Sequence, residues 1–465
     1  MRSPLAPLLG AVAIAIVAWA FVTPPFGVPD EAPHFAYVQS LVENGERPAD
    51  VPSSGHFFSP EVRAGHGYAR TTSALSDPLY KPAWEPDAVR TWRALGEDAP
   101  RDDIAGIGPQ SSHPPLYYAY EALPYGAASG GSIFDRLFLM RLWSGLLMLA
   151  TVGFVWLLVG ELTRGDRLLQ VAGAGCAGLQ PMATFVSAGV NPDALLFASY
   201  SAALWLAARL LRRGASRGAL AGLIAATAVA ALTKASGLAL APALVLVLVM
   251  LVPRERRARA AVAAAAVGGG LVLVGSLATQ RLSSRAPVDL SLESVRGFTT
   301  YLWDFYLPRL PFQHEYAALT LDNPGWTLWV KHPWGSFGSL EVQFPGGVYA
   351  VFAAVALVVL VAGLWAIARS RIDLDRRTGA ALAVTALCLV VGIHWVDFQS
   401  VNDHGLRVIQ GRYLLPLLPI AGVLVAAALS NVGQARRRLA VGLTLGGMAA
   451  LQLASLAVAA GRWYA

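Results

Sequence analysis

The sequence predicts an all-α polytopic membrane protein with about 11 transmembrane helices. This number is the count of apolar runs close to the roughly 20 residues that one crossing requires. Three observations lead to this fold class: 55% of the 465 residues are hydrophobic, only 14% are charged, and long apolar runs recur along the chain. A soluble domain carries about a quarter charged residues. In lipid such runs must be helical, because a helix satisfies its own backbone hydrogen bonds. We therefore expect one multi-pass membrane domain over residues 1–465.

The apolar runs that predict spans are 4–23, 137–160, 168–188, 193–211, 218–233, 237–252, 258–278, 347–368, 378–396, 412–430 and 439–460. The first run contains Ala18-Trp19-Ala20, which is also typical of a signal-peptide cleavage site. We expect this run to remain as a membrane helix, because Asp30 would then lie close to the membrane surface. Cys176 and Cys388 fall within apolar runs, so neither a disulfide framework nor a zinc site is indicated.

Two kinds of loop alternate between these runs. Arginine-rich loops are cytoplasmic by the positive-inside rule, which predicts a cytoplasmic N-terminus and extracytoplasmic loops at 24–136 and 279–346. The net charge of +7 comes largely from arginines at helix ends, so the sequence predicts no nucleic-acid partner. The arginine-rich loops are 164–167, 209–217, 254–259, 369–377 and 436–438.

The loop lengths favour an enzyme over a transporter. Transporters are commonly built from two similar halves and carry intramembrane acids for ion coupling. No repeat is apparent here, and most acids, histidines and tryptophans fall in the predicted outer loops. We therefore expect the chemistry at the outer face, with a lipid or polysaccharide transporter as the alternative.

The strongest catalytic candidate is the acidic pair Asp30-Glu31, which follows a proline-rich exit from the first run. Reduced hydration and a neighbouring like charge are expected to raise the pKa of one of the two carboxyls. One group would then act as a general base, and the other would orient a substrate hydroxyl. The alternative is an acidic N-cap for a helix over 35–42.

Further polar residues are predicted near the same face. His113 precedes Tyr117 in an aromatic segment that would form either a membrane-interface belt or a wall that stacks on a sugar. Asp193 would either cap the helix that it begins or face the same cleft as Asp30. The second long loop contains Trp303, Trp326, Trp329, Trp334, His314, Lys331, His332 and Glu341, which would suit either carbohydrate binding or an interfacial lid.

Two cations stand on the side where positive charge is depleted. Lys234 would either extend toward water or bind an anionic lipid head group. Arg412 opens an apolar run from the outside and needs an anion, for which phosphate suits its paired donors. Arg407, in contrast, is expected to be a surface residue.

On these residues the chain resembles the GT-C class of membrane glycosyltransferases, which use polyprenyl-phosphate sugars as donors. It looks most like a group of bacterial predicted membrane proteins of unassigned substrate within that class. The likeness extends over nearly the whole chain through its topology. The motifs that carry it are short: 25–35, 113–118, 191–193, Lys234 and 410–416.

The resemblance implies that Asp30 is the catalytic base of an inverting enzyme in the bacterial plasma membrane. The donor would be a polyprenyl-phosphate sugar held by Lys234 and Arg412, and the acceptor a glycan, lipid or protein of the cell envelope. The remaining substrate-binding candidates are His34, His113, Tyr117, Asp193 and Tyr413. No second acidic motif like that of the metal-dependent oligosaccharyltransferases is seen, so we expect no metal or other cofactor. A non-catalytic scaffold or an O-antigen ligase-like enzyme is a further alternative, although such ligases concentrate their catalytic groups in a late loop.

Overall fold

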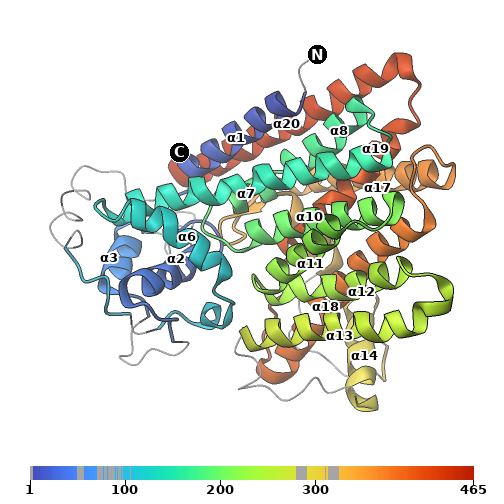
Figure 1. Ribbon diagram of the computed structural model, residues 1–465. Coiled ribbons are helices and arrows are strands. Elements are labelled where there is room, and N and C mark those ends of the chain that lie inside the picture. The colour runs from blue at the N-terminus through green and yellow to red at the C-terminus, as the bar shows by residue number, and fades with distance from the viewer. Residues whose placement is uncertain are drawn as a thin grey trace.

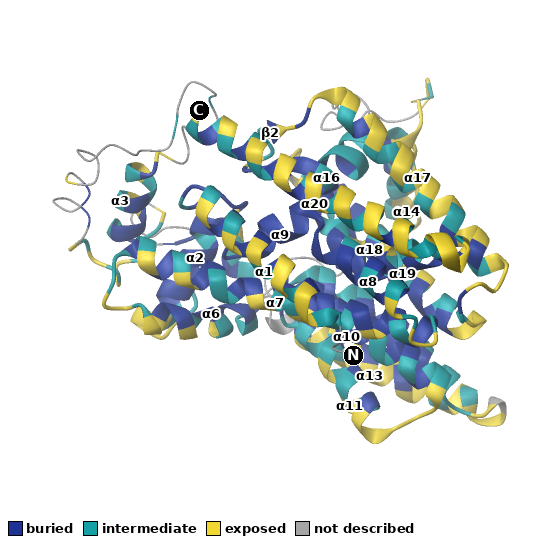
Figure 2. Cartoon of the chain, turned by 90° about the horizontal axis from the view of Figure 1, so that it is seen from above, coloured by how far each residue is buried: buried dark blue, intermediate teal, exposed yellow. Residues whose placement is uncertain are grey.

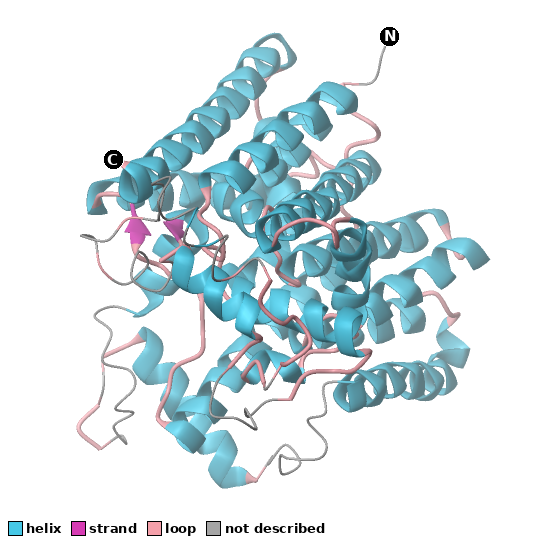
Figure 3. Ribbon diagram, turned by 90° about the vertical axis from the view of Figure 1, so that its left-hand side faces the viewer, coloured by secondary structure: helices cyan, strands magenta, loops and turns pink. Residues whose placement is uncertain are grey.

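The structure is a computed structural model that describes residues 4–49, 57–70, 98–104, 106–278, 291–308, 310–312 and 324–465, with 77, 81, 90, 92 and 96 in addition. Helices dominate it, and the strands form one short hairpin (Figure 3). The first and last helices, α1 and α20, lie side by side, and the helices of the first loop gather at one end of the molecule (Figure 1). Parts of both long loops, including His314, lie outside the described residues.

The elements fall into three groups, with η marking 3₁₀- or π-helical turns. The first loop contributes α2 (Glu31–Gln39), η1 (Ser40–Asn44), α3 (Pro60–Tyr68), η2 (Pro109–Ser112) and α6 (Leu116–Ala127). The second contributes α14 (Leu292–Tyr306), α15 (Pro324–Trp326), η6 (Thr327–Lys331), α16 (His332–Gly335), β1 (Ser336–Phe337) and β2 (Val342–Gln343). The bundle consists of α1 (Leu5–Val22), α7 (Ile133–Leu162), α8 (Arg167–Gly178), α9 (Pro181–Ser187), α10 (Asp193–Arg213), α11 (Arg217–Ala231), η3 (Ala235–Leu240), α12 (Ala241–Met250), η4 (Arg254–Arg256), α13 (Arg257–Ala278), α17 (Gly346–Ala368), α18 (Arg376–His404), η7 (Gly411–Leu417), α19 (Leu418–Ser430) and α20 (Gln434–Tyr464).

Eight helices within the described ranges are long and apolar enough to cross a membrane, so the polytopic all-α class is confirmed but the expected count of 11 is not. The run 168–188 is divided between α8 and α9. Pro181 begins α9, and a proline has no N–H to continue the preceding helix. The runs 218–233 and 237–252 form shorter apolar helices, Arg217–Ala231 and Ala235–Met250.

Contacts join four of the five predicted cytoplasmic loops at one end of the bundle. Asp373 accepts hydrogen bonds from Arg212 Nη2 at 2.7 Å and Arg164 Nε at 3.2 Å, which joins three of the arginine-rich loops. Arg437 reaches Asp166 at 3.0 Å. These loops therefore lie at the same end of the bundle, as the alternation of loops predicts. The orientation of the bundle in the cell stays a prediction.

The outer surface of the bundle suits a lipid environment. Large apolar side chains are exposed along α17, including Val351, Val355, Leu357, Val358 and Val361. Exposed positions also follow α20, whereas α9 is buried throughout (Figure 2). In lipid such an apolar face needs no partner of its own, since lipid tails are as apolar as leucine.

Helix α1 is packed into the core. The ring of fully buried Trp19 lies 5.1 Å from that of Phe185 in α9 and 4.7 Å from that of Phe337 in β1. The strand β1 pairs antiparallel with β2, with Phe337 opposite Val342. The first helix and the second loop therefore share one hydrophobic cluster.

A buried polar network holds the first-loop helices against α7. Glu61 in α3 is ion-paired with Arg136 in α7 and with Arg101, whose Nε lies 3.2 Å from the carboxylate. Gln39 at the end of α2 donates to Glu61 at 2.8 Å. Because α2 begins directly after Asp30, this network also fixes the position of the acidic motif.

Candidate active site

The backbone at Asp30 turns its carboxylate away from the helix that it precedes. Asp30 occupies the N-cap position of α2, but its φ of 61° is left-handed and its side chain makes no capping hydrogen bond. Aspartate is among the residues that tolerate this conformation. A tight turn precedes it, where a Cβ on Gly27 would lie only 2.9 Å from the Pro24 carbonyl oxygen. The N-cap alternative thus describes the position of Asp30 but not the use of its carboxylate.

The carboxylate of Asp30 instead meets Arg412. Arg412 Nη2 donates to Asp30 Oδ2 at 2.5 Å, and Gln110 Nε2 donates to Oδ1 at 3.3 Å. Burial is the largest single influence and would raise the pKa of Asp30, but the charge and hydrogen bond of Arg412, together with His34 and Lys234, outweigh it and lower the pKa to about 2. The expected rise is therefore wrong for Asp30, because a cation rather than a second carboxylate is its nearest charge.

Arg412 retains hydrogen-bonding capacity although it is buried. Its side chain is 4% exposed, yet Nε and Nη1 make no hydrogen bond to the described part of the chain. Nε lies 3.8 Å from Asp193 Oδ2, which is too long for a hydrogen bond. Since unsatisfied buried donors are costly, these two nitrogens are available to an anion.

A second ion pair stands beside the first. Lys234 Nζ lies 2.7 Å from Asp193 Oδ1, and Asp193 is held at the start of α10 by a hydrogen bond from its own N–H to Asn191. The ring of Tyr413 lies under both cations, 4.6 Å from Lys234 Nζ and 5.4 Å from Arg412 Cζ. Two acids and two cations from the first loop, α10, η3 and η7 therefore converge.

Glu31 has a different environment from Asp30. It is 1% exposed and forms a paired contact with Arg141 in α7, with distances of 2.8 and 2.6 Å. Arg141 also donates to the carbonyl oxygens of Ala20, Thr23 and Pro24, at the end of α1. The acidic pair is thus divided: Asp30 faces the cluster, and Glu31 fastens the motif to the bundle.

The histidines form one wall beside Asp30. The Tyr118 hydroxyl lies 2.9 Å from His34 Nδ1 and 3.0 Å from His113 Nδ1, and the two imidazoles stack at 5.7 Å. Burial and the neighbouring His113 hold the pKa of His34 well below its ordinary value, so the ring is neutral at pH 7. The structure brings His34 and His113 together as candidates for this wall.

Tyr117 is not part of this wall. It is fully buried and its hydroxyl lies 2.9 Å from Ser144 Oγ in α7, whereas the next residue, Tyr118, contacts the histidines. Successive residues of a helix point in directions about 100° apart, so α6 turns only one of the two toward the motif. Which of the two tyrosines faces the histidines depends on the rotation of α6 about its axis, and this rotation could not be predicted from the sequence.

Two residues near the cluster, Gln110 and Arg141, were not predicted from the sequence. Gln110 carries no distinctive pattern. His332, which was predicted only as part of the aromatic second loop, lies with its Nδ1 3.5 Å from the Gly411 backbone nitrogen, next to Arg412. Arg141 did have a signal, because a charged residue inside an apolar run is functional or paired by default. Arg407, expected at the surface, is in fact largely buried, with 10% of its side chain exposed.

The aromatic second loop lies partly over this region. Its η6 turn precedes His332, while Glu341 in the hairpin accepts a hydrogen bond from Trp463 of α20 at 3.4 Å. Within the described ranges, no group of three or more His, Cys, Asp or Glu side chains has a geometry that could hold a metal ion.

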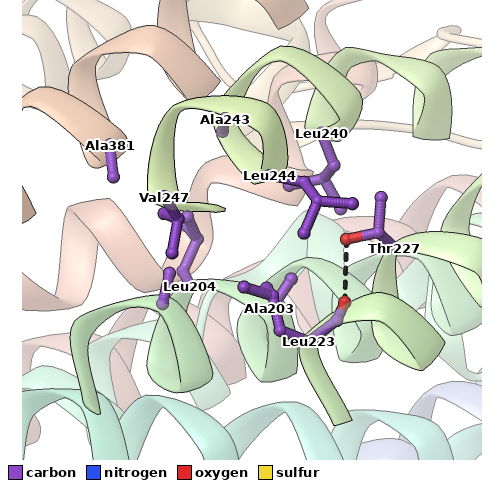
Figure 4. Close-up of a pocket in the computed structure, with 10 residues that line it drawn as sticks. Ala203, Leu204, Leu223, Thr227, Leu240, Ala243, Leu244, Val247 and Ala381 are labelled. Carbon is purple, nitrogen blue, oxygen red and sulfur yellow. Dashed lines mark hydrogen bonds between the residues drawn. The ribbon is translucent and has the colours of Figure 1, made fainter. Parts of the chain in front are cut away.

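Figure 4 shows a small pocket of a different kind, between α10, α11, η3, α12 and α18. Its lining is apolar apart from Thr227, whose hydroxyl donates to the Leu223 carbonyl oxygen at 2.9 Å. Without a charged group, it offers no catalytic chemistry.

A family model described as "Predicted membrane protein (DUF2142)" matches residues 14–421. The chain belongs to this family. The match includes every member of the cluster from Asp30 to Tyr413. Comparison with curated proteins gives no match.

The DUF2142 chain is similar in fold to solved GT-C enzymes. The oligosaccharyltransferase of Archaeoglobus fulgidus matches in its apo form with a TM-score of 0.51 and 12% identity, over 99% of this chain and 56% of that one. The same enzyme tethered to an acceptor peptide gives 0.50 and 12%, over 98% and 55%. ArnT from Cupriavidus metallidurans gives 0.47 and 18%, over 95% and 62%. The chain thus spans less than two thirds of these proteins, and the two matches to the oligosaccharyltransferase show a GT-C-like fold.

Proposed function

We propose that this DUF2142 protein is a membrane glycosyltransferase that moves a sugar from a polyprenyl-phosphate donor to an acceptor outside the cytoplasm. The observation that carries the proposal is the pairing of Asp30 with a buried Arg412 that has unused donors. The acceptor class is a glycan, lipid or protein of the cell envelope, and the GT-C-like fold is compatible with this chemistry.

The donor phosphate is assigned to Arg412 and Lys234. Arg412 Nε and Nη1 would supply a paired contact to two phosphate oxygens. Lys234 keeps further N–H donors beyond its bond to Asp193, and its ammonium group lies over the same tyrosine ring as Arg412. Both cations would stabilise the charge that grows on the phosphate as it departs.

Asp30 is assigned as the base. The acceptor O–H bond breaks and its proton passes to Asp30, while the acceptor oxygen forms a bond to the anomeric carbon. The bond from that carbon to the phosphate oxygen breaks, and its electron pair leaves with polyprenyl phosphate. One direct displacement inverts the anomeric carbon, whereas a double displacement would need a second carboxylate as nucleophile.

The ion pair links donor binding to the strength of the base. With a pKa of about 2, Asp30 is ionised but is a weak proton acceptor. A phosphate that enters competes with Asp30 for Arg412. Loss of this contact raises the pKa of Asp30, so the base would gain strength when the donor is in place.

The remaining candidates receive supporting roles. Glu31 acts through Arg141 as a positioning residue in place of the substrate-orienting role first expected, because its carboxylate is already occupied. Tyr413 lies between the cations, while His34 and His113 form the wall beside Asp30 together with Tyr118. Tyr117 supports Tyr118 from behind and does not touch substrate.

The test is sugar transfer by purified protein in lipid nanodiscs, assayed with a panel of radiolabelled polyprenyl-phosphate sugars and envelope acceptors. Asp30→Asn should lower turnover by about 10²–10⁴-fold, the range for loss of a general base, while donor binding persists. Glu46→Gln, at an exposed site of the same loop, is the matched control. Wild-type turnover by Asp30→Asn would contradict the assignment, and lipid movement without sugar transfer would favour the transporter.

A further inference from the structure

A second arginine, Arg407, stands in a polar cluster outside the proposed catalytic site. It belongs to the extended segment 406–410, in which Leu406 and Val408 are exposed while Ile409 is buried. Successive side chains of an extended segment point to opposite sides. Arg407 therefore turns inward, where its guanidinium carbon lies 5.0 Å from the ring centre of Phe305 in α14.

Asp397, the acid beside Arg407, accepts its hydrogen bonds from other groups and not from the Arg407 guanidinium. Asp397 is fully buried, and its Oδ1 accepts the N–H groups of Val408 at 2.8 Å and Ile409 at 2.9 Å. Its Oδ2 accepts the Tyr301 hydroxyl at 2.6 Å and lies 3.5 Å from Arg407 Nε. The carboxylate is thus satisfied by neutral donors, and it balances the charge of Arg407 without a hydrogen bond to it.

The guanidinium is therefore buried, and its N–H donors lack a well-placed acceptor. Nε, Nη1 and Nη2 are all shielded from solvent. Within the described part of the chain the polar neighbours of the guanidinium are the Tyr301 hydroxyl and Asp397 Oδ2, and neither makes a well-formed hydrogen bond with it. Buried donors without partners are costly, and a planar guanidinium offers paired contacts that match phosphate. The nitrogens therefore lack only an acceptor.

Hydrogen bonds join the elements around Arg407. Tyr306 Oη lies 2.7 Å from His394 Nε2 and accepts a hydrogen bond from Trp329 Nε1 at 2.8 Å, which joins α14, α18 and η6. Five residues separate Arg407 from Arg412, so their Cα atoms are at most about 18 Å apart. A group held by Arg407 would therefore lie near the Asp30 cluster.

We propose that Arg407 forms a second phosphate-binding site, which takes the phosphate of a lipid head group or of a soluble phosphorylated ligand. The inference rests on the Arg407 cluster and does not depend on the proposed glycosyl transfer. The exposed apolar side chains that flank it, Leu406, Val408 and Tyr306, suit a ligand that reaches the site from the membrane surface.

The experiment measures phosphate binding by purified protein in a maltoside detergent, which contains no phosphate. In one arm inorganic phosphate is titrated by calorimetry, and in the other short-chain phosphatidylglycerol is titrated. The variants are Arg407→Gln, Arg412→Gln and the double variant, with Arg438→Gln as the control at an exposed arginine of the opposite end.

Arg407→Gln should weaken one class of binding at least 10-fold while Arg412→Gln leaves that class intact, and the double variant should bind neither ligand. Arg407→Lys keeps the charge and covers the case in which the glutamine variant fails to fold; it should bind about 10-fold more weakly than wild type, because an ammonium cannot make the paired contact. Loss in both arms indicates a general phosphate site, and loss in the lipid arm alone indicates a head-group site. Unchanged binding by both Arg407 variants in both arms would overturn the proposal.

Discussion

Arg412 Nη2 and Asp30 Oδ2 lie 2.5 Å apart although 382 residues separate them in the chain. The pair joins the first loop to the start of the η7–α19 span. It also brings Asp30, the candidate catalytic base, into contact with Arg412, a candidate ligand of the donor phosphate.

The two cations should differ in their effect on donor use. Arg412→Ala should weaken donor binding and slow turnover together, since a lost transition-state donor costs on the order of 2.7–4 kcal/mol. Arg412→Lys should restore only part of the loss. Lys234→Ala should have a smaller effect in the same direction. Turnover and donor affinity are measured with one polyprenyl-phosphate sugar, with Arg438→Ala as the control; near-normal values for both alanine variants would remove these residues from the site.

Glu31→Gln should damage stability more than chemistry. The change leaves Arg141 buried without its charge partner, which typically costs about 3–5 kcal/mol. Thermal unfolding in detergent should therefore show a lower midpoint, whereas Glu46→Gln should shift it little. A Glu31→Gln protein that is as stable as wild type but inactive would instead return Glu31 to a direct catalytic role.

The pH dependence of turnover follows from Arg412. In the free enzyme Asp30 has a pKa of about 2, so wild-type kcat/KM should show no acid limb from Asp30 between about pH 4 and about pH 8. Arg412→Gln removes the largest charge that lowers the pKa of Asp30, so the acid limb should move to higher pH. The stability that the ion pair contributes should be present above the unfolded pKa and lost as the pH falls toward 2. An unchanged pH profile in the Arg412→Gln variant would show that Arg412 does not lower the pKa of Asp30.

Activity should survive EDTA. Asp30 and Asp193 are each paired with a cation, and a hard divalent ion prefers several oxygen ligands. The measurement is turnover after chelation, followed by addition of magnesium or manganese. Restoration by either ion would place Asp30, Asp193 or a further acid in a metal site.

The orientation of the bundle is tested by single-cysteine labelling, after replacement of Cys176 and Cys388. A cysteine at Ser112, in the first long loop, should react with an impermeant maleimide in intact cells. One at Ser370, in an arginine-rich loop, should react only after lysis. The reverse pattern would put the Asp30 cluster on the cytoplasmic side.

The sequence predicted the fold class because membrane helices have a strong compositional signature, but it did not predict how the helices break. Pro181 divides an apolar run of ordinary spanning length, and composition alone does not show whether a proline kinks or ends a helix. The short helices around η3 likewise depend on packing rather than on hydropathy.

The candidate site was predictable in its residue types and less so in their individual roles. Asp193, Lys234 and Arg412 were chosen because each is charged on the outer side of a span, and all three lie beside Asp30 in the structure. The sequence did not predict that Asp30 faces the cluster while Glu31 pairs with Arg141. This difference depends on the left-handed backbone at Asp30 and on Arg141 from another helix. The inward orientation of Arg407 likewise could not be predicted, because it depends on which side chains of the segment 406–410 face the interior.

The long separation of Asp30 from Arg412 has a consequence for biosynthesis. Chains are synthesised from the N-terminus and their parts fold as they emerge, so Asp30 is made with the first helix and its partner is made 382 positions later. A ribosome-bound chain that stops before Arg412 holds the proposed base without the guanidinium that opposes it. Under the proposed mechanism, catalytic competence would therefore arise only after the segment that carries Arg412 has been inserted, and shorter nascent chains would not act on the donor lipid.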